Sequence, residues 1–528
     1  MKDKLIVIPI ILLLAGLAGI TEPLRAQEVV VDTTYGKVSG VPNAKIKTVS
    51  FKGIPYAEPP VGDLRWRPPQ PVKAWRGVRK ADKLSPSCMQ NTEKEHLPWT
   101  AEFMTSNDLS EDCLYLNVWT PQPTTSAKLP VVVFIHGGGF GGGSGGIAIY
   151  DGEQLAATGL VVITINYRVS VFGFLALPEL TAESEHHSSG NYGLMDQIAA
   201  LRWIKENISS FGGDPARVTI WGQSAGAFSV QDLIASPLAA GLFSRAAADS
   251  GIGIAGLKPA TLADAEAEGV KFAASRQAAS LKELRAKPAA ELLPKNAVFS
   301  GASWAPIVDG WLLPASPNQL SEKGADNDIP VMTGYMANDG LLFADPISKV
   351  EDYEQNAKKI YGAMTPEFLK LYPATDVEQA KKMNELSTRD RERASAYVWA
   401  SQRARNHHAP VYTFFFDRAI PWPQHPEFGA FHTGEIPYFF RNLKLLDRPW
   451  EPADFTVSEQ ASGYLKNFAT TGDPNGKSLP QWPAAAGSSG TTMEFGSHTG
   501  SIPVAEKDRL DFWVRYFSST EVANAPVF

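Results

Sequence analysis

The amino-acid sequence predicts an α/β protein in which helices flank a central, mostly parallel β-sheet. Short apolar runs rich in β-branched residues recur along the chain, and amphipathic segments separate several of them. This alternation is typical of βαβ units, which build parallel sheets. The 528 residues are 44% hydrophobic and 20% charged, a composition that allows a large core and does not fit a disordered or fibrous protein.

The predicted strands and helices follow these patterns. The apolar runs predict strands at residues 114–119, 130–136, 161–166, 218–222, 329–334 and 411–416. Amphipathic segments predict helices at residues 194–208 and 225–234. Residues 257–293 are rich in Ala, Glu and Lys, and we expect them to form helical segments inserted over the sheet and the active site.

The N-terminus has the features of a secretory signal peptide. Lys2 and Lys4 precede an apolar run at residues 5–20, and a short polar stretch follows it. We therefore predict a signal peptide at residues 1–26 and one α/β domain at residues 27–528, periplasmic or secreted. An uncleaved membrane anchor is the alternative, although the run is shorter than the ~20 residues of a bilayer span. No later stretch is apolar and long enough to span, so we expect no stable membrane insertion after cleavage.

Export would place the two cysteines, Cys88 and Cys113, in an oxidising compartment. An even cysteine count in such a compartment predicts a disulfide. It would close a loop of about 25 residues, which the chain-entropy model values at about 3 kcal/mol. Two unrelated buried thiols are the alternative.

The charge balance argues against nucleic acid as a partner. The sequence holds 49 Lys and Arg against 56 Asp and Glu, a formal net charge of -7. Nucleic-acid affinity comes largely from clustered basic residues that contact the phosphate backbone. We therefore expect no nucleic-acid partner.

The strand predicted at residues 218–222 leads directly into the pattern G-x-S-x-G at residues 222–226, and a helix-compatible run follows. A strand, a tight turn and a helix are the context of a nucleophile elbow, in which the turn exposes the serine hydroxyl. The helix N-terminus behind the serine favours negative charge. The pattern predicts Ser224 as a nucleophile, and an ordinary serine in a glycine-rich turn is the alternative.

A glycine-rich loop follows the strand predicted at residues 130–136. Its sequence at residues 136–140, His-Gly-Gly-Gly-Phe, matches the H-G-G-G loop of esterases. Backbone N–H groups of such a loop stabilise the negative charge on the oxygen of a tetrahedral intermediate. We assign these donors to Gly138, Gly139 and Ala225.

Two other patterns overlap this loop. Ser144 is the centre of a second G-x-S-x-G, and residues 137–142 match G-x-G-x-x-G, which is found at dinucleotide sites. Ser144 has no strand directly before it and no helix directly after it, so we interpret it as a loop residue. More glycines follow where a dinucleotide fold begins its helix, which disfavours that alternative.

The general base is expected late in the chain, because this motif set follows the order Ser, acid, His. His432 lies in a loop that leads into an apolar helix start, and we prefer it to His425. His407 and His408 precede the strand predicted at residues 411–416, and we interpret them as solvated helix-end residues.

The orienting acid is expected directly after a strand, where a carboxylate can reach the histidine. Asp339 follows the strand predicted at residues 329–334 and is our choice. Asp309 precedes that strand and is the main rival.

Two longer stretches resemble the signatures of a known family. Residues 211–226 resemble the serine signature of the type-B carboxylesterases, and residues 111–118 resemble their second signature. Shorter similar stretches lie at residues 166–168, 190–197 and 249–251. The resemblance covers nearly the whole mature chain and implies an α/β-hydrolase fold, in a family that includes acetylcholinesterase and bacterial p-nitrobenzyl esterases.

The resemblance also implies residue roles. It implies a triad of Ser224, Asp339 and His432, and a disulfide between the two cysteines. It implies two buried ion pairs that belong to the scaffold: Arg65 with Glu111, and Arg168 with Asp196. The side chains expected around the triad are Gln223, Ser250 and Glu435, with the Ser250 hydroxyl near Asp339.

Two positions depart from the family pattern. Many members carry Glu as the triad acid and Glu before the nucleophile, where this chain has Asp339 and Gln223. Aspartate can still accept the imidazole N–H, so the triad is retained. Gln223 removes a negative charge beside the nucleophile, which weakens the case for a cationic, choline-like substrate.

Together the motifs predict a serine esterase that acts on a small-molecule ester. Ser224 attacks the carbonyl, His432 takes the proton, and an acyl-enzyme forms and is hydrolysed, with no metal or cofactor required. Two alternatives stay open. The same triad can act on amides or carbamates, and the chain can be a non-catalytic binding or adhesion member of the family.

Overall fold

The structure covers most of the predicted domain. The computed structural model describes residues 28–92, 96–254, 259–294, 304–340, 346–487 and 490–519. The signal peptide predicted at residues 1–26 lies outside the described residues. No helix within the described ranges is long and apolar enough to cross a membrane.

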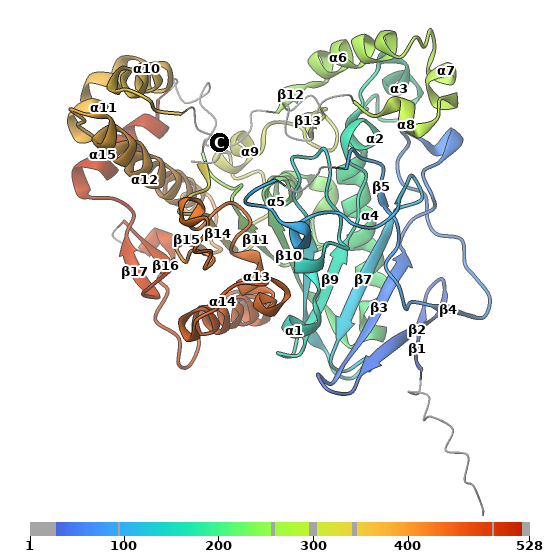
Figure 1. Cartoon of the computed structure of the whole chain (residues 1–528). Helices are drawn as coiled ribbons and strands as arrows, with labels where there is room; N and C mark the ends of the chain where they lie inside the picture. The colour runs from blue at the N-terminus through green and yellow to red at the C-terminus, as the bar shows by residue number, and fades with distance from the viewer. Residues whose placement is uncertain are drawn as a thin grey trace, which may run out of the picture.

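A 13-stranded sheet forms the centre of the molecule (Figure 1). In spatial order its strands are β1 (Val29–Thr33), β2 (Gly36–Asn43), β3 (Thr48–Pro55), β7 (Tyr115–Thr120), β9 (Val161–Ile165), β8 (Leu129–Ile135), β10 (Gly213–Gln223), β11 (Arg245–Asp249), β14 (Val331–Met336), β15 (Val411–Phe416), β16 (Thr491–Phe495) and β17 (Gly500–Pro503), and β4 (Val78–Lys80) pairs with β2. Every neighbouring pair from β9 to β16 is parallel. The pairs from β1 to β9 and the pair β16–β17 are antiparallel. The predicted, mostly parallel sheet is confirmed.

Helices cover both faces and the upper end of this sheet (Figure 1). They are α1 (Glu153–Ala156), α2 (Ser170–Phe174), α3 (Pro178–Glu183), α4 (Tyr192–Asn207), α5 (Ala225–Ala235), α6 (Leu262–Ser275), α7 (Leu281–Ala286), α8 (Ala289–Leu292), α9 (Pro317–Glu322), α10 (Val350–Tyr361), α11 (Thr365–Leu371), α12 (Val377–Arg403), α13 (Ile436–Phe439), α14 (Pro452–Thr471) and α15 (Lys507–Phe517). The two predicted helices correspond to α4 and α5. Within the predicted insertion at residues 257–293, α6, α7 and α8 lie together at the upper end of the sheet.

Strand β8 shows why the sheet is covered on both faces. Val131, Val133 and Ile135 pack into a core that includes side chains of α4, whereas Val132 and Phe134 pack into a second core that includes side chains of α14. Side chains of a strand point alternately to the two faces. Since both faces are covered, the strand has a continuous apolar run instead of an alternating one.

Strand β11 is the central strand that the sequence patterns miss. Its sequence, Arg-Ala-Ala-Ala-Asp, contains no β-branched residue, and alanine favours helices. The structure buries Ala246, Ala247 and Ala248 completely between β10 and β14. Helix α5 packs on β10 and β11, and the small side chains leave room for it.

Two buried ion pairs join loops to this scaffold, as the family resemblance implies. Arg168 donates to Asp196 through Nε at 2.8 Å and through Nη2 at 2.7 Å, and neither side chain is more than 3% exposed. Arg65 and Glu111 form a second two-bond pair. Such pairs make the loops they join costly to open, because an opened loop leaves a buried charge without its partner.

We predict that Asp196→Asn lowers the free energy of unfolding by about 3–5 kcal/mol, because the buried Arg168 charge loses its counter-charge. Urea denaturation measures this loss. The matched control is Asp214→Asn, since the Asp214–Arg217 pair is about a quarter exposed, at 23% and 29%, and should cost less than about 1 kcal/mol. Equal losses in the two variants would show that burial does not make the Arg168–Asp196 pair more stabilising than a partly exposed pair.

Candidate active site

Ser224 lies in a strained turn between β10 and α5. Its φ is 57° and its ψ is -125°, a backbone conformation rare for a residue with a side chain. A Cβ atom on Gly222 would collide with the Gly226 carbonyl, and one on Gly226 with the Ile135 carbonyl. The two glycines of the motif are therefore required by close backbone approach, and the structure has the strand, turn and helix that the pattern predicts.

His432 is held by Asp339. The Nδ1 atom of His432 is 2.7 Å from Oδ1 of Asp339, which is fully buried. Oδ2 of Asp339 accepts hydrogen bonds from the Ser250 hydroxyl at 2.6 Å and from the Met336 N–H at 2.7 Å. Three hydrogen-bonding groups therefore surround this one buried carboxyl group. A ring proton on Nδ1 would face this carboxyl group and leave Nε2 with a lone pair.

These residues come from the carboxyl ends of adjacent strands. Ser224 follows β10, Ser250 follows β11 and Asp339 follows β14. His432 lies in the long connection between β15 and α13, where its carbonyl accepts a hydrogen bond from Trp99 Nε1 at 3.1 Å. The order β10-β11-β14-β15 thus brings together side chains that are more than 200 residues apart in the chain.

A pocket joins the serine, the histidine and the glycine-rich loop. Ser224, Gln223 and His432 line it together with Gly137 and Gly138. Gly138 and Gly139 have φ values of 107° and 59°, which turn the loop that follows β8. Ala225 is the first residue of α5. The predicted nucleophile, base and oxyanion loop therefore meet at one pocket.

His136 stabilises the start of the glycine-rich loop. Its ring stacks on Tyr167 with a centroid separation of 4.3 Å, and Tyr167 donates a hydrogen bond to the His136 carbonyl at 2.8 Å. Burial lowers the pKa of His136 to about 4, so this side chain is neutral. His136 therefore holds the loop and does not compete with His432 as a base.

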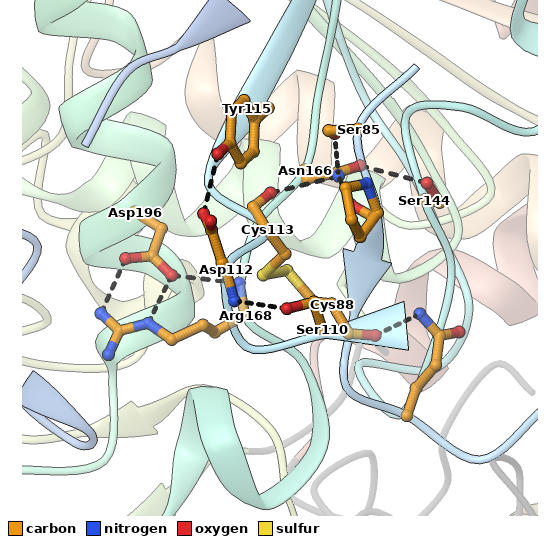
Figure 2. The surroundings of a disulfide bond; sticks show 12 residues. Ser85, Cys88, Ser110, Asp112, Cys113, Tyr115, Ser144, Asn166, Arg168 and Asp196 are labelled. Carbon is orange, nitrogen blue, oxygen red and sulfur yellow. Dashed lines mark hydrogen bonds and ion pairs between the residues drawn. A yellow bond between two sulfur atoms is a disulfide. The ribbon is translucent and has the colours of Figure 1, made fainter. Parts of the chain in front are cut away.

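Described residues of the disulfide loop also line the pocket. Cys88 and Cys113 are bonded, which confirms the predicted disulfide (Figure 2). The short strands β5 (Ser87–Cys88) and β6 (Leu109–Ser110) pair within the loop. Loop residues Trp99 and Phe103 line the pocket, and Phe103 also packs against Phe431 at 5.8 Å between ring centroids. The bond thus closes the segment that shapes the pocket.

Three further buried carboxyl groups surround Asp339. Trp221 Nε1 donates to Oδ2 of Asp249 at 2.7 Å, and the Gly340 N–H donates to Glu392 at 3.0 Å. Burial raises the pKa of Asp249 to about 8 and raises those of Glu392 and Glu435 well above their usual range. Burial therefore favours the neutral form of each of these three groups.

Sequence reasoning named only Glu435 of these three acids. Asp249 and Glu392 are missed because their proximity to Asp339 arises from sheet order and from the packing of α12. One local signal exists for Asp249, since it ends a strand and directly precedes Ser250.

The rival residues lie in other environments. Asp309 accepts hydrogen bonds from Ser188 at 2.7 Å and from two backbone N–H groups of its own turn. His425 is partly exposed and pairs with Glu427 at 3.0 Å. Ser144 donates to Asn166 at 3.1 Å in the surroundings of the disulfide (Figure 2).

One histidine prediction is wrong. His408 is exposed as expected, but His407 is buried and contacts Asp326, which also pairs with Arg403. A histidine at a helix end can be buried when a carboxylate of a buried ion pair contacts its ring. Among the described residues, no group of three or more His, Cys, Asp or Glu side chains is arranged to hold a metal ion.

The parallel sheet, the strained serine turn and the His–Asp pair at the strand ends define an α/β hydrolase. The carboxylesterase family model matches residues 27–513, and the chain belongs to this family. It is 36% identical to fumonisin B1 esterase of Sphingopyxis macrogoltabida, over 91% of this chain and 89% of that protein. It is also 36% identical to para-nitrobenzyl esterase of Bacillus subtilis, over 86% and 92%, and 33% identical to human cocaine esterase, over 85% and 84%.

We predict that Asp249→Asn becomes more stable relative to the wild type as the pH rises from about 5 to 8. The folded protein holds a proton on Asp249 that the unfolded chain loses above about pH 4, so this group costs stability as the pH rises towards 8. Asparagine keeps an acceptor for Trp221 but cannot ionise. Urea denaturation at the two pH values measures the difference, and a difference independent of pH would contradict a neutral Asp249.

Proposed function

We propose that this chain hydrolyses carboxylic esters through an acyl-enzyme on Ser224. The observation that carries the proposal is the 2.7 Å contact between His432 and Asp339, at a pocket lined by both His432 and Ser224. The family supports ester hydrolysis by a serine hydrolase, because the matched relatives carry esterase names. The ester is a small molecule.

The reaction begins with the serine. The Ser224 oxygen forms a bond to the ester carbonyl carbon, its proton passes to Nε2 of His432, and the carbonyl electron pair moves onto the oxygen. The N–H groups of Gly138, Gly139 and Ala225 are the proposed donors to this oxyanion. The imidazolium then gives its proton to the leaving alcohol, and an acyl-enzyme remains.

Water completes the cycle by the same groups. His432 takes a proton from the water as it attacks the acyl carbon, and a second tetrahedral oxyanion forms in the same hole. Its collapse releases the carboxylic acid and returns the proton to Ser224. Asp339 stays ionised throughout and stabilises the imidazolium, with Ser250 and Met336 holding its second oxygen.

We also propose that the protein is exported. The charged and apolar N-terminal pattern at residues 1–26 is typical of a cleaved signal peptide. The disulfide between Cys88 and Cys113 fits an oxidising compartment such as the periplasm or the medium.

We predict that Ser224→Ala and His432→Ala each lower kcat/KM on p-nitrophenyl esters by at least about 10⁴-fold, because each removes a group that forms or breaks a bond. A panel of p-nitrophenyl esters with the matching anilides measures the loss and tests ester against amide preference. His425→Ala is the control and should be nearly silent. Turnover that survives Ser224→Ala, with the protein folded, would refute the nucleophile.

We predict that Asp339→Asn lowers kcat by about 10⁴-fold, as the equivalent change does in a serine protease triad, because the amide can stabilise the wrong imidazole tautomer. Asp339→Glu should keep far more activity than Asp339→Asn, since the longer carboxylate can still accept the Nδ1 proton. Asp309→Asn is the control, because Asp309 serves its own turn. If Asp309→Asn loses activity and Asp339→Asn keeps it, the acid is Asp309.

A further inference from the structure

The side chain of Gln223 lies against the base. Gln223 ends β10, next to Ser224, and is 1% exposed. Its amide nitrogen, Nε2, is 3.2 Å from Nε2 of His432. Its amide oxygen lies on the side of the glycine-rich loop, where a Cβ atom on Gly137 would come within 2.9 Å of it. The amide thus lies between the base and the loop that supplies the oxyanion donors.

The protonation state of His432 determines whether the Gln223 amide can donate a hydrogen bond to Nε2 or accept one from it. The Nδ1 proton is committed to Asp339, so Nε2 of the neutral ring offers a lone pair and no proton. The nitrogen of a glutamine amide only donates, and its oxygen only accepts. With the nitrogen facing the ring, Gln223 donates to Nε2. In the proposed reaction, the Ser224 proton must arrive at this same lone pair.

Proton transfer to His432 removes the lone pair to which the Gln223 amide donates. Once His432 carries the Ser224 proton, Nε2 becomes an N–H group and faces the donor side of the amide. A half-turn of the amide presents its oxygen instead, and the oxygen accepts from the imidazolium. A neutral amide can therefore complement both states of the base, whereas a carboxylate at this position complements only the charged state.

We propose that Gln223 is a positioning residue for the general base: it donates a hydrogen bond to Nε2 of neutral His432 and turns to accept a hydrogen bond from the Nε2–H group when the imidazolium forms, until that proton passes to the leaving alcohol. This inference rests on the proposed function. The inference gives Gln223 hydrogen bonds to His432 both before and after proton transfer, in addition to its position next to Ser224.

Other titratable groups around His432 come from several elements. They are Asp339 after β14, Asp249 at the end of β11, Glu392 on α12, Glu435 before α13, and His96 and Tyr150, which line the same pocket. Burial raises the pKa of Asp249, Glu392 and Glu435, which favours their neutral forms. A new charge at position 223 would therefore act on His432 in a setting where Asp339 is the main negative neighbour.

Two substitutions separate the donor and acceptor roles. Gln223→Glu places a carboxyl group against Nε2 of His432. Contact with the imidazolium favours its ionised form against the burial that raises the pKa of Asp249, so the acid limb of the kcat/KM profile should move to higher pH. In Gln223→Met, the methionine side chain is similar in size to glutamine but neither donates a hydrogen bond nor accepts a strong one. For Gln223→Met we expect kcat to fall about tenfold with KM within about twofold, because the hydrogen bond lost to the charged imidazolium is stronger than the one lost to the neutral ring. Its acid limb should move much less than that of Gln223→Glu.

A spectroscopic measurement tests the resting contact directly. In a Ser224→Ala background with ¹⁵N-labelled histidine, the Nε2 resonance of His432 should move towards that of a free lone pair when Gln223→Met is added. Gln231→Met is the matched control, because Gln231 is a buried glutamine on α5 that donates to Asn318 instead. It should leave kcat, the acid limb and the His432 resonance unchanged.

The outcomes distinguish this inference from the proposed function. An unmoved acid limb in Gln223→Glu, an unchanged kcat in Gln223→Met and an unmoved resonance would overturn the role of Gln223 while the enzyme stays active. Activity that survives Ser224→Ala would instead overturn the nucleophile itself.

Discussion

The buried charge of Asp339 is the constraint on which the site depends. A carboxylate removed from water is stable only when donors surround it, and here the donors come from three places: the His432 ring, the Ser250 hydroxyl after β11 and the Met336 N–H at the end of β14. Each donor needs its strand at the right position in the sheet. The order β10-β11-β14-β15 is therefore an electrostatic requirement of the site as well as a packing arrangement. The neutral state of Asp249, beside Ser250, keeps a second charge away from the first.

The strained turn at Ser224 depends on the same sheet. A positive φ at a serine costs on the order of 1–3 kcal/mol and persists only where the surroundings enforce it. Here β10 is paired on both sides, and the Ser224 N–H donates to the Asp249 carbonyl at 2.9 Å, so the turn is tied to the neighbouring strand. Because Gly222 and Gly226 allow the backbones to touch, the α5 N-terminus lies directly behind the nucleophile.

The features whose predicted local geometry the structure contains share one property, which is that neighbouring residues in the chain define them. The Ser224 turn and the glycine-rich loop are each specified by a strand and the glycines that follow it. Asp249, Glu392 and the buried state of His407 are different, because each depends on which distant element packs against it. Strand β11 escaped prediction for a related reason: its alanines suit a central strand beneath α5, although alone they favour a helix. The prediction of His432 needed both the expected order of serine, acid and histidine and the loop that leads into an apolar helix start, since His425 also follows β15.

The charges around the base also bear on which esters suit the pocket. Asp339 contacts Nδ1 of His432, and burial raises the pKa of Asp249 and Glu435, which disfavours a charge on either. Among the described residues that line the pocket there is no Asp or Glu. Gln223 adds no negative charge at the position next to the nucleophile. The pocket wall formed by the disulfide loop contributes the aromatic side chains of Trp99 and Phe103. We infer that an ester with an apolar portion suits this wall, because apolar surface is buried favourably against aromatic side chains.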